Sequence, residues 1–75
     1  MKKKTLPSKE EILLGTRIIL AIKLKGWTQK EFAQKAGFEP YEVSRWTTGL
    51  YPPNALELKR IATVTSQPID FFFKE

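Results

Sequence analysis

The 75-residue chain contains no cysteine and no histidine, and aspartate occurs once, at Asp70. Without cysteine no disulfide can form, and without cysteine or histidine the soft ligands of a structural zinc site are missing. One aspartate among scattered glutamates forms no recognisable acid–base pair, so we expect neither an enzyme nor a metal, cofactor or small-molecule site. A chain without cysteine suits a reducing cytoplasm, which is the expected location.

Long apolar runs are also lacking. Lys2–Lys4 precede a stretch rich in isoleucine and leucine, which is the order found in a signal peptide. Glu10, Glu11 and Arg17 interrupt this stretch, however, and no segment approaches the roughly 20 apolar residues of a membrane span. The sequence therefore predicts neither secretion nor membrane insertion.

Positive charge is concentrated at the start of the chain. Residues 1–27 carry seven basic side chains against two acidic ones, which is the whole net charge of +5. Residues 1–7 show no periodicity and predict a basic flexible arm, followed by a single domain over residues 8–75. Lys2–Lys4 can follow DNA phosphates or reach into a minor groove, or they can form a simple solvated tail.

The same spacing marks the start of three helices. A hydroxyl or amide side chain is followed three residues later by glutamate, so that each side chain accepts a hydrogen bond from the other residue's backbone N–H. These pairs are Ser8 and Glu11, Thr28 and Glu31, and Asn54 and Glu57. The first helix should run to about Lys25, because Gly26 can end it. Pro40 suits the first turn of another helix, and Pro68 precedes a short last one over Ile69 to Phe73. The prediction is an all-α bundle of five short helices.

Thr28 to Gly49 contains two amphipathic segments that meet at Gly37. Phe32, Ala33 and Ala36 form one apolar stripe, and the two small alanines let a second helix approach closely. In the second segment Val43 and Trp46 point to the core. Phe32 and Trp27 are also assigned to the core. Helix, glycine turn and helix form the unit that places its second helix in the major groove of DNA.

The outer face of the second helix carries groups that can contact DNA. Tyr41, Ser44, Arg45 and Thr48 share this face at positions i, i+3, i+4 and i+7. Arg45 can donate two hydrogen bonds to O6 and N7 of a guanine, although outside this motif it would be an ordinary surface arginine. Tyr41 can touch a thymine methyl group or donate to a phosphate, and Ser44 is small and adaptable.

These features resemble the lambda-repressor-like helix-turn-helix family of Cro and phage repressors, over roughly Leu14 to Phe72. The matching residues are Gly15, Ile18, Gly26, the run Trp27 to Ala33, Ala36, Gly37, the run Val43 to Trp46, Gly49, Pro53 and the run Ile69 to Phe72. The resemblance implies a compact five-helix domain with the helix-turn-helix in its second and third helices. It also implies sequence-specific binding of double-stranded DNA, as a transcriptional repressor or regulator of phage or mobile-element type.

Further site residues follow from the resemblance and from the helix ends. The resemblance implies that Gln29 contacts a backbone phosphate, and the N–H groups at the start of its helix independently suit an anion. Thr28 and Lys30 flank Gln29 and complete this end of the predicted site. Tyr51 can donate a hydroxyl hydrogen bond from the connection after Gly49.

Two site residues depart from the family pattern. Glu39 stands at the front of the second helix together with Glu42, where carboxylates repel phosphates but can accept from cytosine N4 or favour the positive end of the helix dipole. Pro40 stands where related proteins often carry a base-reading amide. Both residues stay within the predicted DNA-binding set.

The first helix is apolar nearly all round. Its family core face is formed by Leu14, Ile18, Ala21 and Ile22. Leu13, Leu20 and Leu24 form a second stripe about 100° away. The C-terminal phenylalanines can cover this stripe, although three in succession cannot all face one way, or a partner can cover it. A homodimer through these leucines with Phe71 or Phe73 is one expectation. The alternative function is a protein-interaction module of the same fold, such as an antitoxin-like partner-binding domain.

Overall fold

The computed structural model describes residues 8–49 and 51–74, and its elements in these ranges are all helical. They are α1 (Lys9–Leu24), α2 (Gln29–Ala36), α3 (Pro40–Thr47), α4 (Ala55–Thr65) and the 3-10 helix η1 (Ile69–Phe73). The all-α prediction is confirmed, and the last of the five predicted helices is a short 3-10 helix with the predicted bounds. The basic arm predicted over residues 1–7 lies outside the described residues, as do Leu50 and Glu75, so the division into arm and domain stays a prediction.

All three predicted capping boxes form. Ser8, Thr28 and Asn54 each donate their backbone N–H to the glutamate three residues later at 2.8 Å. Their side chains accept from that glutamate's own N–H in return. The first turns of α1, α2 and α4 therefore have their otherwise unpaired donors satisfied locally, as the sequence indicated.

Three helices end in the same way. Gly26, Gly37 and Ser66 follow α1, α2 and α4 with left-handed φ values of 76°, 79° and 60°. In each case the next residue donates its N–H to the carbonyl five residues back, at distances of 2.9 to 3.2 Å. This is the Schellman ending, in which glycine is preferred because it has no Cβ. Ser66 adopts this left-handed conformation although it carries a Cβ atom, which makes the conformation less favourable than for glycine.

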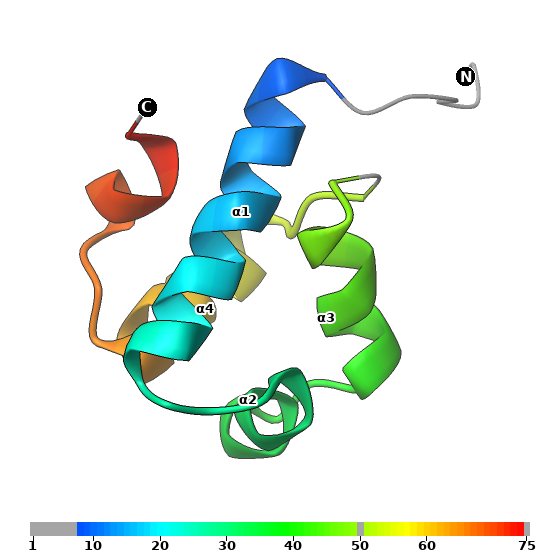
Figure 1. Ribbon diagram of the computed structural model, residues 1–75, viewed down its shortest axis with the longest axis vertical. Coiled ribbons are helices and arrows are strands. Elements are labelled where there is room, and N and C mark those ends of the chain that lie inside the picture. Colours follow the sequence, from blue (N-terminus) through cyan, green and yellow to red (C-terminus); the bar gives the residue numbers. More distant parts are fainter. Residues whose placement is uncertain (1–7, 50, 75) are drawn as a thin grey trace.

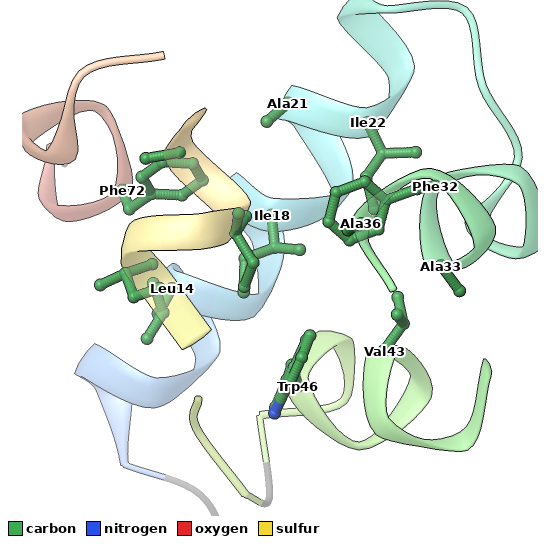
Figure 2. Packing of buried hydrophobic residues seen from close by; sticks show 13 residues of the cluster. Leu14, Ile18, Ala21, Ile22, Phe32, Ala33, Ala36, Val43, Trp46 and Phe72 are labelled. Atoms are coloured by element: carbon green, nitrogen blue, oxygen red, sulfur yellow. The ribbon is translucent and has the colours of Figure 1, made fainter. Parts of the chain in front are cut away.

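Helix α1 runs through the middle of the molecule (Figure 1). Helix α3 packs on one side of it and η1 on the other, while α2 and α4 complete the enclosure. The side chains between these elements form a single core (Figure 2), whose members are Leu14, Ile18, Ala21, Ile22, Phe32, Ala33, Ala36, Val43, Trp46, Leu58, Ile61, Ala62 and Phe72. The inward faces predicted for α1, α2 and α3 are therefore confirmed. Within the described ranges, no helix combines the length and the apolar character that crossing a membrane requires.

Helices α1 and α3 approach each other closely at Gly15 of α1. A Cβ atom at this position would lie 2.7 Å from the carbonyl oxygen of Trp46 and 2.9 Å from that of Thr47. Both oxygens belong to the C-terminal turn of α3. The missing side chain at Gly15 is thus what lets α3 lie directly against α1.

The C-terminal phenylalanines divide between core and surface. Phe72 is completely buried, Phe71 is half-buried and Phe73 is exposed. Arg17 of α1 holds this segment, because its Nε donates to the carbonyl oxygen of Lys74 at 3.0 Å and its guanidinium lies 5.5 Å from the centre of the Phe71 ring. The C-terminus therefore covers part of the apolar surface of α1, which is the first of the two expected coverings.

Trp27 was assigned to the core, and this assignment is wrong in part. The indole is half-buried and packs against the edge of the core. Two ammonium groups lie near the ring, those of Lys25 at 5.8 Å and Lys35 at 5.1 Å from the ring centre. An indole can face both an apolar core and cations in this way because its π face attracts positive charge.

Candidate nucleic-acid interface

Phe38, which directly follows the turn glycine, contacts residues of both α2 and α3. Its ring packs edge-on against Trp46 with 4.7 Å between ring centres, and lies 6.2 Å from Phe32. Arg60 of α4 also contacts this turn, with its guanidinium 5.4 Å from the centre of the Phe38 ring and its Nη1 donating to the carbonyl of Ala36 at 3.4 Å. The turn between the two helices is therefore held by the core on one side and by α4 on the other.

Sequence reasoning did not single out Phe38 or Arg60. The signal for Phe38 was present, because an apolar residue directly after a helix-ending glycine commonly packs back onto that helix. Arg60 gave no such signal, since its contacts with Phe38 and Ala36 lie 22 and 24 residues away in the sequence. Both residues act on the site by holding its framework.

Helix α3 presents the outward face that its periodicity predicted. Val43 and Trp46 are buried, and the side chains on the other side of the helix are exposed. This exposed set consists of Tyr41, Ser44, Arg45 and Thr48. Figure 1 shows α3 at the edge of the molecule. The four predicted side chains are thus brought together on one accessible surface.

The start of α2 offers backbone donors close to exposed polar side chains. The hydroxyl of Thr28 accepts a hydrogen bond from the backbone N–H of Glu31 at 3.1 Å. The N–H groups of Gln29 and Lys30 come before it and have no acceptor within the helix, because the first turn provides none. Both side chains are exposed. This arrangement can bind an anion such as a phosphate, as the N-terminal ends of helices commonly do.

The two glutamates at the start of α3 have different environments. Glu42 is half-buried, and its carboxylate accepts the backbone N–H of Glu39 at 2.9 Å. Of the roles considered for this carboxylate, the structure therefore supports that of a charge at the helix start. The Glu39 side chain is exposed beside Pro40, which occupies the first helical position as expected.

Arg45 makes a contact that the sequence did not indicate. Its guanidinium carbon lies 4.3 Å from the centre of the ring of Tyr51, which belongs to the connection between α3 and α4. The hydroxyl of Thr48 donates to the backbone carbonyl of Arg45 at 2.9 Å, so that this hydroxyl is turned toward its own helix. Arg45 and Tyr51, which sequence reasoning assigned to separate contacts, thus lie together.

Comparisons with known proteins agree with this geometry. The model of one protein family, described as helix-turn-helix, matches residues 18–72. A solved structure described as the crystal structure of a hypothetical transcription factor, NHTF, from Neisseria is similar with a TM-score of 0.80 and 17% sequence identity. The similarity covers 97% of this chain and 87% of that one, and at this identity it shows a shared fold. No curated protein matches the chain significantly.

Proposed function

Since the chain belongs to the helix-turn-helix family, of Cro/C1 type, we propose that it binds double-stranded DNA in a sequence-specific manner through the outer face of α3. The observation that carries the proposal is the exposed face of Tyr41, Ser44, Arg45 and Thr48 on a helix whose other side is buried. The description of the Neisseria structure as a transcription factor supports a role in transcription regulation. The finer proposal is a repressor of phage or mobile-element type.

The proposed complex divides its contacts between phosphates and bases. The N-terminal end of α2, with Thr28, Gln29 and Lys30, binds a backbone phosphate and sets the position of α3 along the groove. Arg45 reads a guanine with its two-pronged guanidinium. Tyr41 contacts a thymine methyl group or a phosphate, and Glu39 can accept from a cytosine amino group at the rim.

Selection of duplexes from a random pool tests the proposal directly. The chain should enrich one sequence that contains at least one strongly preferred guanine. Its affinity for that duplex should fall steeply between two salt concentrations, because phosphate contacts release bound counterions. Failure to enrich any sequence would contradict sequence-specific binding.

Replacement of Arg45 by alanine should flatten the preference at one base position. We expect a loss of about 1–3 kcal/mol of discrimination against the other bases there, which is the usual worth of a bidentate arginine–guanine pair. Competition binding with the four duplex variants at that position measures it. Arg45→Lys is the matched control, because it keeps the positive charge and loses the two parallel N–H donors of the guanidinium. Equal weakening on every sequence by alanine, with recovery by lysine, would make Arg45 a phosphate contact instead.

Removal of residues 1–4 should lower affinity without changing sequence preference. This segment holds three of the seven basic residues in the part of the chain that carries the net charge. Each lysine that neutralises a phosphate contributes about 0.9 to the slope of log affinity against log salt. The slope of the truncated chain should therefore be shallower. An unchanged slope would identify the lysine tract as a solvated tail.

A second candidate function is a protein-interaction module of the same fold. It is favoured by the exposed leucines of α1 and by the balanced charge of residues 28–49, which contain three basic and three acidic residues. A module of this kind would show weak duplex binding with no preferred sequence. The pool selection and the salt titration therefore separate the two candidates.

A homodimer is part of the proposal, because one recognition helix reads only a few base pairs and related domains bind paired half-sites one helical turn apart. Leu24 with 61% and Phe73 with 57% of their surface exposed are the most available members of the proposed contact. Leu20 is also exposed, whereas Leu13 and Phe71 are half-buried. In a two-fold dimer this surface would meet its own copy.

Replacement of Leu24 by glutamate should abolish self-association and leave the monomer folded. The side chain is exposed, so a charge there costs the isolated domain little, but it would be desolvated in a dimer. Sedimentation with and without a palindromic duplex measures the change. Leu56, with 79% exposure on α4, provides the control variant Leu56→Glu. Equal behaviour of the two variants would contradict a dimer through α1.

A further inference from the structure

The contact between Arg45 and Tyr51 is the shortest cation–ring contact in the described part of the chain. The guanidinium carbon of Arg45 lies 4.3 Å from the ring centre, whereas the other four contacts measure 5.1 to 5.8 Å. Both side chains are exposed, so the contact is not a by-product of core packing. Attraction between the cation and the negative face of the ring holds the two groups together.

A stacked guanidinium can still form hydrogen bonds. The guanidinium is planar and can stack on an aromatic face, and its N–H donors then point outward in its own plane. The fork that recognises O6 and N7 of guanine therefore stays available while the ring restricts the rotation of a long, flexible side chain. Because the side chain is already restricted, less conformational entropy is lost when Arg45 binds DNA.

Tyr51 is itself placed by residues that are fixed on both sides. Gly49, two residues before it, is buried, and a Cβ atom there would lie 3.3 Å from the backbone of α1 at Glu11 and Ile12. Pro53, two residues after it, is also buried, and the ring of Pro52 restricts the backbone torsions of Pro52 itself and of Tyr51. The ring can therefore act as a platform whose position relative to α1 is set by the fold.

We infer that Tyr51 is a positioning residue, which holds the guanidinium of Arg45 in the direction that reads guanine and so contributes to the base preference at that position. The inference rests on the proposed function. It gives Tyr51 a role through its ring, which differs from a hydroxyl hydrogen bond to a phosphate. The two roles respond differently to substitution, because Tyr51→Phe keeps the ring and loses the hydroxyl, whereas Tyr51→Leu loses both.

The test measures the guanine preference in a double-mutant cycle. One probe is the duplex that the wild-type chain selects from a random pool. The other three carry each of the other bases at one position, the guanine that the Arg45→Ala variant no longer distinguishes. Tyr51→Leu should reduce the preference about three- to fivefold, the effect of losing one exposed cation–π contact. It should have no further effect in the Arg45→Ala background, and Tyr51→Phe should retain the preference. Proton NMR of the free proteins should show the Arg45 Hδ signals shifted upfield by the ring in the wild type and in Tyr51→Phe, but not in Tyr51→Leu.

Each outcome bears on the inference. Equal weakening of all four duplexes by both Tyr51 variants would overturn it in favour of a hydroxyl–phosphate contact. An unaltered preference in Tyr51→Leu, or a loss that persists without Arg45, would also overturn it and leave the proposed function intact. Failure of the wild-type chain to select any duplex would overturn the proposed function and the inference together.

Discussion

Replacement of Phe72 by alanine is expected to lower the free energy of unfolding by about 3–5 kcal/mol, which is the usual cost of truncating a buried phenylalanine. The Phe72 side chain is completely buried, and its ring packs edge-on against Phe71 with 5.3 Å between ring centres. Alanine would leave a cavity where η1 meets α1 and α4. Small domains have only about 5–15 kcal/mol of stability in total, so much of it would be lost.

Phe73→Ala provides the matched control, because it makes the same change in the neighbouring residue. Its ring is exposed, so that the cost should stay within about 0.5 kcal/mol. Urea and thermal unfolding followed by circular dichroism measure both variants, and each kcal/mol should lower Tm by about 4–8 °C in a domain of this size. If the two variants lost similar stability, the C-terminal segment would not be anchored through Phe72.

The contrast between these phenylalanines marks a limit of sequence reasoning. The pattern showed that Phe71, Phe72 and Phe73 cannot share one face, but it did not indicate which of them enters the core. That depends on how the 3-10 turn meets α1 and on Arg17, which reaches from α1 to the carbonyl of Lys74. The last helix has its predicted bounds, Ile69–Phe73, but its 3-10 type could not be predicted, since a five-residue segment has little periodicity of its own.

Local signals, in contrast, predicted most of the framework. Each capping box involves residues three apart, so its hydrogen bonds depend little on the rest of the fold. The inward faces of α2 and α3 followed from helical spacing, which fixes the relative directions of Phe32, Val43 and Trp46. The outward face of α3 is their complement, and the residues of the candidate site could therefore be named before the structure was known.

The environments of the site residues could not be predicted in the same way. Arg45 and Tyr51 are six residues apart across the end of a helix, and no periodic pattern relates two such positions. The ring of Trp27 lies near the ammonium group of Lys35, which follows it by eight residues. Contacts of this kind are set by how elements pack, and they determine how a named side chain can act.

Replacement of Gly15 by alanine should destabilise the domain by about 1–3 kcal/mol, with a larger effect for valine. The new Cβ would meet the carbonyl oxygens of Trp46 and Thr47 at 2.7 and 2.9 Å. These atoms are backbone, so relief requires that α3 move away from α1. Within a helix, alanine is more favourable than glycine by about 1 kcal/mol. A lower free energy of unfolding in Gly15→Ala would therefore mean that the steric conflict outweighs this gain.

Gly26→Ala separates the steric conflict at Gly15 from the general cost of replacing a glycine. A Cβ atom at Gly26 would meet nothing within 4 Å, so only its positive φ of 76° opposes the change, at about 1–2 kcal/mol. Both variants should lose stability, but only Gly15→Ala displaces α3. At a temperature where both are fully folded, Gly15→Ala should therefore bind the selected duplex more weakly, whereas Gly26→Ala should bind it like the wild type. Undiminished affinity in Gly15→Ala would mean that the contact between α1 and the last turn of α3 stabilises the fold without setting the position from which Arg45 reaches DNA.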